Sequence, residues 1–131
     1  MGFERDYIMR QIMQLLEVLQ RILGHRIKGE KEEAEEQIRY FYNILKWKID
    51  IRKLSIEELL EYTQRKMNLS NPQIELLAFV LKEQGELAPN EDERLDFFRK
   101  AYFLLDKVER ESTSFSMDRQ MKLAELKAYL N

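Results

Sequence analysis

The spacing of apolar residues near the N-terminus constrains the fold more than any other feature of the sequence. Steps of four and three residues separate Ile8, Ile12, Leu15, Leu19 and Ile22. Residues at this spacing share one side of an α-helix, because the helix has about 3.6 residues per turn. Gly24 follows the last of them and favours a left-handed helix end. The pattern therefore predicts a helix over about 6–23. The apolar stripe is widened by Met9, Met13, Leu16 and Leu23, which predicts more than one neighbour for this helix.

Helical signals continue through the next part of the chain. A run of glutamates favours a second helix over about 31–48. Its inner face consists of Ala34, Ile38, Phe41 and Leu45. Residues 49–54 alternate apolar and charged side chains with no second strand to pair with, which predicts an extended connector. Ser55 and Glu58 have the spacing of a capping box, so a short third helix is expected from there to about Met67.

Three further helices are predicted in the C-terminal half. Asn71-Pro72 is a start signal for a strongly apolar helix over about 72–84, which Gly85 is expected to end. Asn90 and Glu93 repeat the capping-box spacing before a long helix over about 91–110. The last helix carries one face of small and flexible apolar residues, namely Met117, Met121, Ala124 and Ala128.

These elements predict an all-α fold of about six helices in antiparallel hairpins. The hairpins could form a compact bundle or a curved α-α superhelix. The chain has 131 residues, of which 44% are hydrophobic and 35% charged. That length and composition suit one globular domain over residues 1–131 that folds without a cofactor.

One stretch resembles a hairpin of the tetratricopeptide repeat family. It runs Ala-Phe-Val-Leu-Lys-Glu-Gln-Gly over residues 78–85 and Leu-Asp-Phe-Phe-Arg-Lys-Ala-Tyr-Phe-Leu-Leu over residues 95–105. The matching parts are the small residue Ala78, the glycine Gly85, and Phe98 with Ala101 in the second helix. The resemblance implies a helix–turn–helix unit over about 72–110, although its loop is longer and the closing proline is missing. A weaker similarity covers residues 21–45.

The opening residues 3–12, together with residues 54–60 and this hairpin, also resemble a family of small uncharacterised bacterial helical proteins, a domain of unknown function. That second resemblance implies an all-helical fold in a bacterial cytoplasmic setting. It implies no particular activity and no catalytic residue. An export signal is not expected, because Glu4, Arg5, Asp6 and Arg10 interrupt the apolar residues at the N-terminus. We therefore expect a cytoplasmic protein that does not enter the membrane.

The sequence offers little for catalysis, for metal binding or for a cofactor. It contains no cysteine and a single histidine, His25, which is expected at a helix end. Glu32 and Glu36 stand four residues apart, but helical metal sites of this type usually add Glu-x-x-His pairs that are missing here. The four glycines, at positions 2, 24, 29 and 85, stand too far apart for a phosphate-binding loop. We expect no enzymatic activity, no metal and no cofactor.

Binding is therefore the favoured class of function, with a protein or peptide as the partner. The candidate interaction surface consists of Ile8, Ile12, Leu15, Leu19, Tyr40, Trp47, Lys48 and Arg52. The stripe from Ile8 to Ile22 has heptad spacing and could seat a second copy of the chain or a partner helix, although core packing is the favoured explanation. A homodimer through the first helix is thus one option.

Two other classes of function stay open at this point. A small enzyme or ligand-binding protein would use an aromatic pocket between helices, lined by Tyr40, Tyr42, Trp47 and Tyr102. A weak nucleic-acid binder would use the basic cluster from Lys46 to Lys53, which contains Trp47. Nucleic acid is the less favoured partner, because 22 basic and 24 acidic side chains leave a net charge of only -2.

Overall fold

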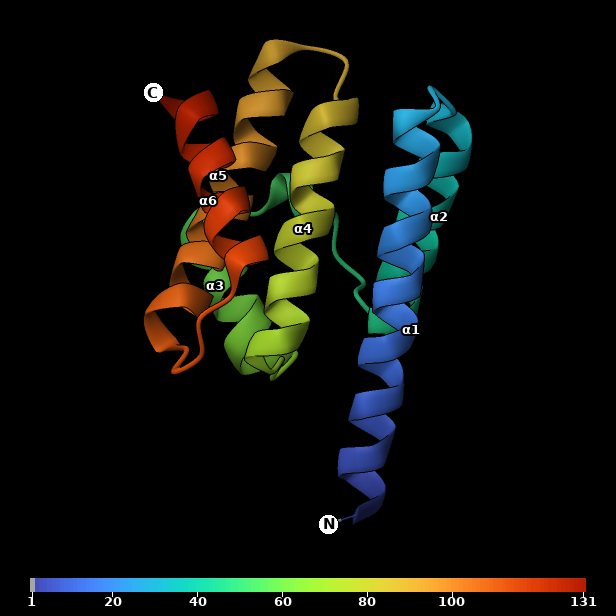
Figure 1. The fold of residues 1–131 in the computed structure, drawn as a ribbon, viewed down its shortest axis with the longest axis vertical. Coiled ribbons are helices and arrows are strands. Elements are labelled where there is room, and N and C mark those ends of the chain that lie inside the picture. Colours follow the sequence, from blue (N-terminus) through green and yellow to red (C-terminus); the bar gives the residue numbers. More distant parts are fainter. Residues whose placement is uncertain (1) are drawn as a thin grey trace. The chain divides into compact units, whose positions relative to one another are not determined.

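The computed structural model describes the backbone of residues 2–131 and the side chains of residues 5–131. Regular secondary structure within this part of the chain is entirely helical, which confirms the all-α class and the six predicted helices (Figure 1). The α-helices are α1 (Gly2–Ile27), α2 (Lys31–Leu45), α3 (Ile56–Glu61), α4 (Asn71–Leu87), α5 (Glu91–Glu111) and α6 (Met117–Leu130). Two short elements flank α3: the 3₁₀ turn η1 (Ile51–Lys53) and the π-helical turn η2 (Tyr62–Lys66).

The chain divides into two compact units, Met1–Lys48 and Ile49–Asn131. The sequence predicts a single domain, because its length suits one core. The first unit is a hairpin of α1 and α2, and the second contains η1, α3, η2, α4, α5 and α6.

The turn between α1 and α2 lies later than the sequence predicts. Gly24 stays inside α1, which continues to Ile27. Gly29 takes the left-handed conformation, with φ of 77°, and its N–H donates to Arg26 O at 3.0 Å. The prediction that Gly24 ends the helix is wrong, because the left-handed residue needed for the turn is supplied five positions later by Gly29.

The end of α2 also differs from the prediction. The helix stops at Leu45 and not at Lys48, because Lys46 is left-handed with φ of 63°. The N–H groups of Lys46 and Trp47 donate back to Asn43 O at 3.1 Å and Tyr42 O at 2.9 Å, which satisfies carbonyls at the helix end. The reversal places the Trp47 ring against Tyr42, with 6.1 Å between the ring centroids.

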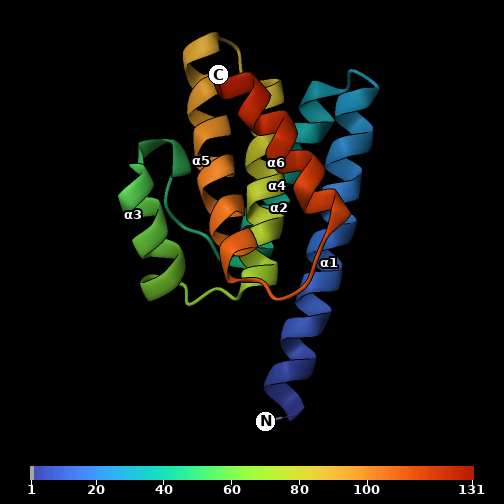
Figure 2. The same ribbon diagram turned by 60° about the vertical axis from the view of Figure 1, so that its left-hand side comes forward.

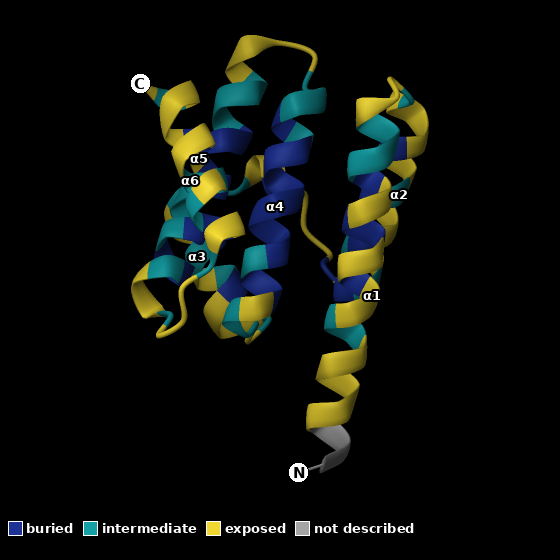
Figure 3. Cartoon of the chain, in the orientation of Figure 1, coloured by how far each residue is buried: buried dark blue, intermediate teal, exposed yellow. Residues whose placement is uncertain are grey.

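Helix α1 is much longer than its partner in the hairpin. It has 26 residues and α2 has 15, which correspond to lengths of about 39 and 22 Å. Gln11 Nε2 donates to Ile44 O at 3.2 Å, so Gln11 lies level with the last turn of α2. Residues 5–10 of α1 therefore lie past the end of α2, and they are exposed (Figure 1 and Figure 3).

In the second unit, α5 contacts α3, α4 and α6 (Figure 2). The apolar residues buried most completely on α4 and α5 are Ile74, Leu77, Ala78, Val80, Leu81, Phe98, Ala101, Leu104 and Leu105. The connector that we expected to be extended is the 3₁₀ turn η1, which Asp50 caps and which buries Ile51. Apolar alternation over so few residues does not distinguish a strand from a tight turn with one buried side chain.

Local capping signals are correct for two helices and displaced for a third. Ser55 and Glu58 form the full capping box at the start of α3, and Asn90 Oδ1 accepts from Glu93 N at 2.9 Å at the start of α5. At α4 the cap is Ser70 and not Asn71, because the N–H and the hydroxyl of Ser70 both donate to Gln73 Oε1, at 2.8 and 3.0 Å. The Asn71 side chain instead donates from Nδ2 to Glu111 Oε1 on α5 at 3.2 Å. Pro72 still lies in the first turn, where it costs no hydrogen bond.

Gly85 does not end α4, which continues to Leu87. It serves instead as the point of closest approach between α4 and α5. A Cβ atom at this position would lie 2.5 Å from Phe98 Cε1 and 2.6 Å from Phe98 Cδ1. The Phe98 ring is fully buried and stacks on Tyr129 of α6 with 4.7 Å between centroids. The absence of a side chain at Gly85 therefore creates the space that the Phe98 ring fills.

Alanine at Gly85 and alanine at Gly24 should have opposite effects on stability. Both glycines are helical, so the gain in helix propensity should be similar at about 1 kcal/mol. No neighbouring atom lies within 4 Å of a Cβ at Gly24, so Gly24→Ala should raise the free energy of unfolding. Gly85→Ala should lower it by a net amount of about 1–2 kcal/mol, because Phe98 must move within a packed core. Urea denaturation followed by circular dichroism measures both, and equal effects at the two sites would contradict the close approach.

Candidate functional site

The structure separates the residues of the predicted interaction surface on α1. Ile8 is exposed and Ile12 is partly buried, whereas Leu15 and Leu19 are buried in the core. Leu15 and Leu19 therefore do not belong to an exposed contact surface. The heptad stripe is divided along its length, so that its C-terminal part is buried and its N-terminal end is accessible.

The remaining residues of that surface differ in their exposure and in the unit to which they belong. Tyr40 is exposed on α2, and its hydroxyl accepts from Gln14 Nε2 at 3.2 Å. Trp47 is only 8% exposed, so its ring has no face available for stacking on a base. Lys48 and Arg52 are exposed but belong to different units, and Arg52 is paired with Asp50 at 3.0 Å.

Two of the four aromatic residues suggested for a pocket, Tyr42 and Trp47, pack against neighbouring rings. Tyr42 contacts Phe41 edge-on, with 6.0 Å between ring centroids, and also contacts Trp47. Phe41 and Trp47 are both buried. Tyr102 lies on α5 and so belongs to the other unit.

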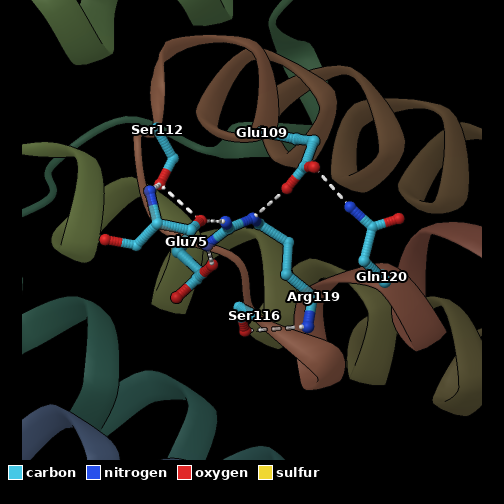
Figure 4. Close-up of polar contacts among 7 residues, drawn as sticks. Glu75, Glu109, Ser112, Ser116, Arg119 and Gln120 are labelled. Atoms are coloured by element: carbon cyan, nitrogen blue, oxygen red, sulfur yellow. Dashed lines mark hydrogen bonds and ion pairs between the residues drawn. The ribbon is translucent and has the colours of Figure 1, made fainter.

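Buried ionisable groups are the usual sign of an active site, and Arg119 is the most connected of them (Figure 4). Its side chain is 5% exposed and forms ion pairs with Glu75 of α4 at 2.8 Å and Glu109 of α5 at 2.6 Å. Its third nitrogen donates to Ser114 O at 2.8 Å. Gln120 also donates to Glu109. The hydrogen bonds from Arg119 to Glu75 and then to Glu109 raise the pKa of the guanidinium.

Three buried lysines are engaged in the same way. Lys100 Nζ donates to Ile51 O at 3.1 Å, Arg52 O at 3.3 Å and Asp96 at 2.7 Å, and so fixes η1 to α5. Lys107 lies 3.0 Å from Glu111, and this hydrogen bond lowers the pKa of the Glu111 carboxyl. Lys82 pairs with Glu125 of α6 at 3.0 Å. These ammonium groups join helices to one another and do not converge on a common point.

The other groups considered for chemistry are at the surface. His25 Nδ1 lies 2.8 Å from Glu30 Oε1 in the turn that joins α1 to α2. Glu32 and Glu36 are exposed on α2. Among the residues whose side chains are described, no three His, Cys, Asp or Glu residues are grouped so that they could hold a metal ion.

An exposed apolar stripe on α1 has no structural role in its own unit. We call it the outer stripe, and it consists of Met9, Met13, Leu16, Leu23 and Ile27. Met13 is 64% and Ile27 74% exposed, and only Leu23 is partly buried. At about 100° per residue, the outer stripe lies on the opposite side of α1 from Gln11 and Gln14, which bond to α2. The hairpin partner therefore leaves this side of α1 uncovered.

Charged residues of alternating sign follow one edge of the outer stripe. In chain order they are Asp6, Arg10, Glu17 and Arg21, and all four are exposed. Arg21 and Glu17 are 3.9 Å apart on successive turns. An apolar centre with a charged edge is the arrangement found at helix–helix contacts.

Apolar spacing predicts that Met9, Met13 and Leu16 widen the stripe toward a second neighbour, and all three are exposed in the structure. On α6, the face that carries Met117, Met121, Ala124 and Ala128 is also exposed. The buried residues of α6 are Arg119 and Leu126, because the helix is oriented by the ion pairs of Arg119. A periodic apolar face identifies a helix, whereas its contacts are decided by the packing of the other helices.

No family model, curated protein or solved structure matches this chain. The resemblances to the tetratricopeptide repeat and to the small bacterial family therefore stay predictions. In the described part of the chain, no helix combines the length and the apolar character that crossing a bilayer requires.

Proposed function

We propose that this chain is a non-catalytic protein–protein interaction module and that its contact surface is the outer stripe of α1. The observation that carries the proposal is the exposure of Met9, Met13 and Leu16 on successive turns of one helix. Contiguous exposed apolar residues with a charged edge are typical of a binding surface, since isolated exposed apolar residues are common but an ordered row is not. Two of the three are methionines, whose flexible side chains adapt well to a partner.

The buried ionisable groups also support a non-catalytic function, because each of them has partners within the fold. Arg119, Lys100, Lys107 and Lys82 each have acidic or carbonyl partners within the second unit. Each of these groups thus contributes to the fold, and none needs a substrate to explain its position. The burial of Trp47 likewise favours a protein partner over nucleic acid.

Site-specific photo-crosslinking in the native cell tests this proposal. A photoreactive amino acid at Met13 should produce a discrete crosslinked protein species, because a partner would lie against this position. The same amino acid at Glu57, which is exposed on α3, is the matched control and should produce none. A Met13 variant that folds normally and yields no discrete product would overturn the proposal.

A further inference from the structure

We infer that the partner of the outer stripe is a second copy of this chain, packed antiparallel along α1. This inference rests on the proposed function and specifies the partner. A twofold axis would make the contact isologous, so that each residue of α1 meets its counterpart in reversed order. The surface must then be complementary to itself when the helix direction is reversed, and the order of charges along α1 meets this condition.

The charged edge is complementary to itself in one antiparallel register. Asp6 and Arg10 are four residues apart, as are Glu17 and Arg21. When Arg10 of one copy lies opposite Glu17 of the other, Asp6 therefore lies opposite Arg21. In an antiparallel helix pair the same edge of each helix faces its copy, so each contact along this edge joins opposite charges. The twofold axis repeats both contacts.

The same register also brings Met9, Met13 and Leu16 of the two copies together. Its axis passes between Met13 and Gln14. Met9 of one copy then falls between Leu16 and Gln20 of the other. Leu16 falls between Met9 and Met13. Side chains that insert between residues of the facing helix form the knobs-into-holes packing of coiled coils. Charge and shape thus select the same register.

A parallel arrangement does not have this complementarity. In a parallel pair, each edge of one helix faces the opposite edge of the other. The opposite edge of the outer stripe carries Ile8, Ile12 and Leu19, so the charges of Asp6, Arg10 and Glu17 would meet apolar residues. Those charges would lose water without gaining a partner. The antiparallel pair is therefore the favoured arrangement.

Sedimentation equilibrium of the full chain, with two charge-reversal variants, tests the inference. The wild-type chain should form a reversible dimer. Arg10→Glu places a second carboxylate against Glu17 of the copy, and Glu17→Arg places a second guanidinium against Arg10 of the copy. Each variant alone should have a dimer dissociation constant about tenfold higher or more, because like charges meet twice across the axis. An equimolar mixture of the two variants should recover the dimer, since both contacts then join opposite charges.

Further variants separate the inference from the proposed function. The double variant R10E/E17R should dimerise like the wild type, and Glu57→Arg, a charge reversal on α3, should leave the dimer unchanged. If Arg10→Glu and Glu17→Arg left the dimer dissociation constant unchanged, the proposed register would be wrong. If the wild-type chain remained monomeric while Met13 crosslinked to a different protein, the inference of a second copy would be wrong. The proposed function would still hold. Circular dichroism of each variant confirms that α1 is retained.

Discussion

Replacement of Arg119 by methionine should lower the free energy of unfolding of the second unit by about 3 kcal/mol. The range for removing one member of a buried ion pair is about 3–5 kcal/mol, because the remaining charge stays buried without a partner. The lower end applies here, since the carboxylates of Glu75 and Glu109 are 24% and 31% exposed and retain some contact with water. Methionine has a length similar to that of arginine. The decrease in the free energy of unfolding therefore comes from the lost hydrogen bonds more than from lost packing.

Chemical denaturation measures this effect against a matched control. Arg110 forms an ion pair with Asp106 at 3.1 Å, but both side chains are largely exposed. Arg110→Met should therefore change the free energy of unfolding by no more than about 0.5 kcal/mol. Arg119→Lys should fall between the two, because lysine keeps the charge but cannot reach both carboxylates and Ser114 O at once. Similar values for Arg119→Met and Arg110→Met would show that the Arg119 network does not hold α6 in place.

Truncation of Leu77 to alanine should have a comparably large effect. Leu77 is fully buried on α4, and its removal leaves a cavity among side chains that cannot collapse freely. Leucine-to-alanine changes at such positions cost about 2–5 kcal/mol, and Leu81, which is buried to the same extent, should behave alike.

A surface truncation provides the reference for Leu77. Met117 is 63% exposed at the start of α6, and Met117→Ala should change stability by less than about 0.5 kcal/mol. The urea concentrations at the midpoints of unfolding of Leu77→Ala, Leu81→Ala and Met117→Ala measure the change in stability at each position. A small effect at Leu77 would contradict its burial in the core of this unit.

The two largest effects come from different kinds of interaction within the same unit. Leu77 and Leu81 stabilise α4 through apolar burial, whereas Arg119 fixes the position of α6 through directional bonds to α4 and α5. The partners of Arg119, Glu75 and Glu109, both lie in the second unit, whereas Met13 lies in the first.

The sequence by itself determined where most helices lie. Apolar spacing identified α1, α2 and α5, and side-chain capping identified the starts of α3 and α5. These signals are local, because helix periodicity and capping involve residues within one or two turns. The absence of cysteine and the presence of one histidine also limited the kinds of chemistry that the chain can support.

Only the tertiary structure decided which apolar faces are buried and what each glycine does. Leu15 and Leu16 are adjacent in sequence, yet Leu15 is fully buried and Leu16 is 44% exposed, because a partner helix covers only part of α1. The residues next to Gly24, Gly29 and Gly85 in the sequence do not reveal their different roles. Gly24 is an ordinary helical residue, Gly29 forms a turn, and Gly85 makes room for Phe98. Such outcomes depend on contacts between residues that are distant in sequence, and helix period and local composition carry no information about them.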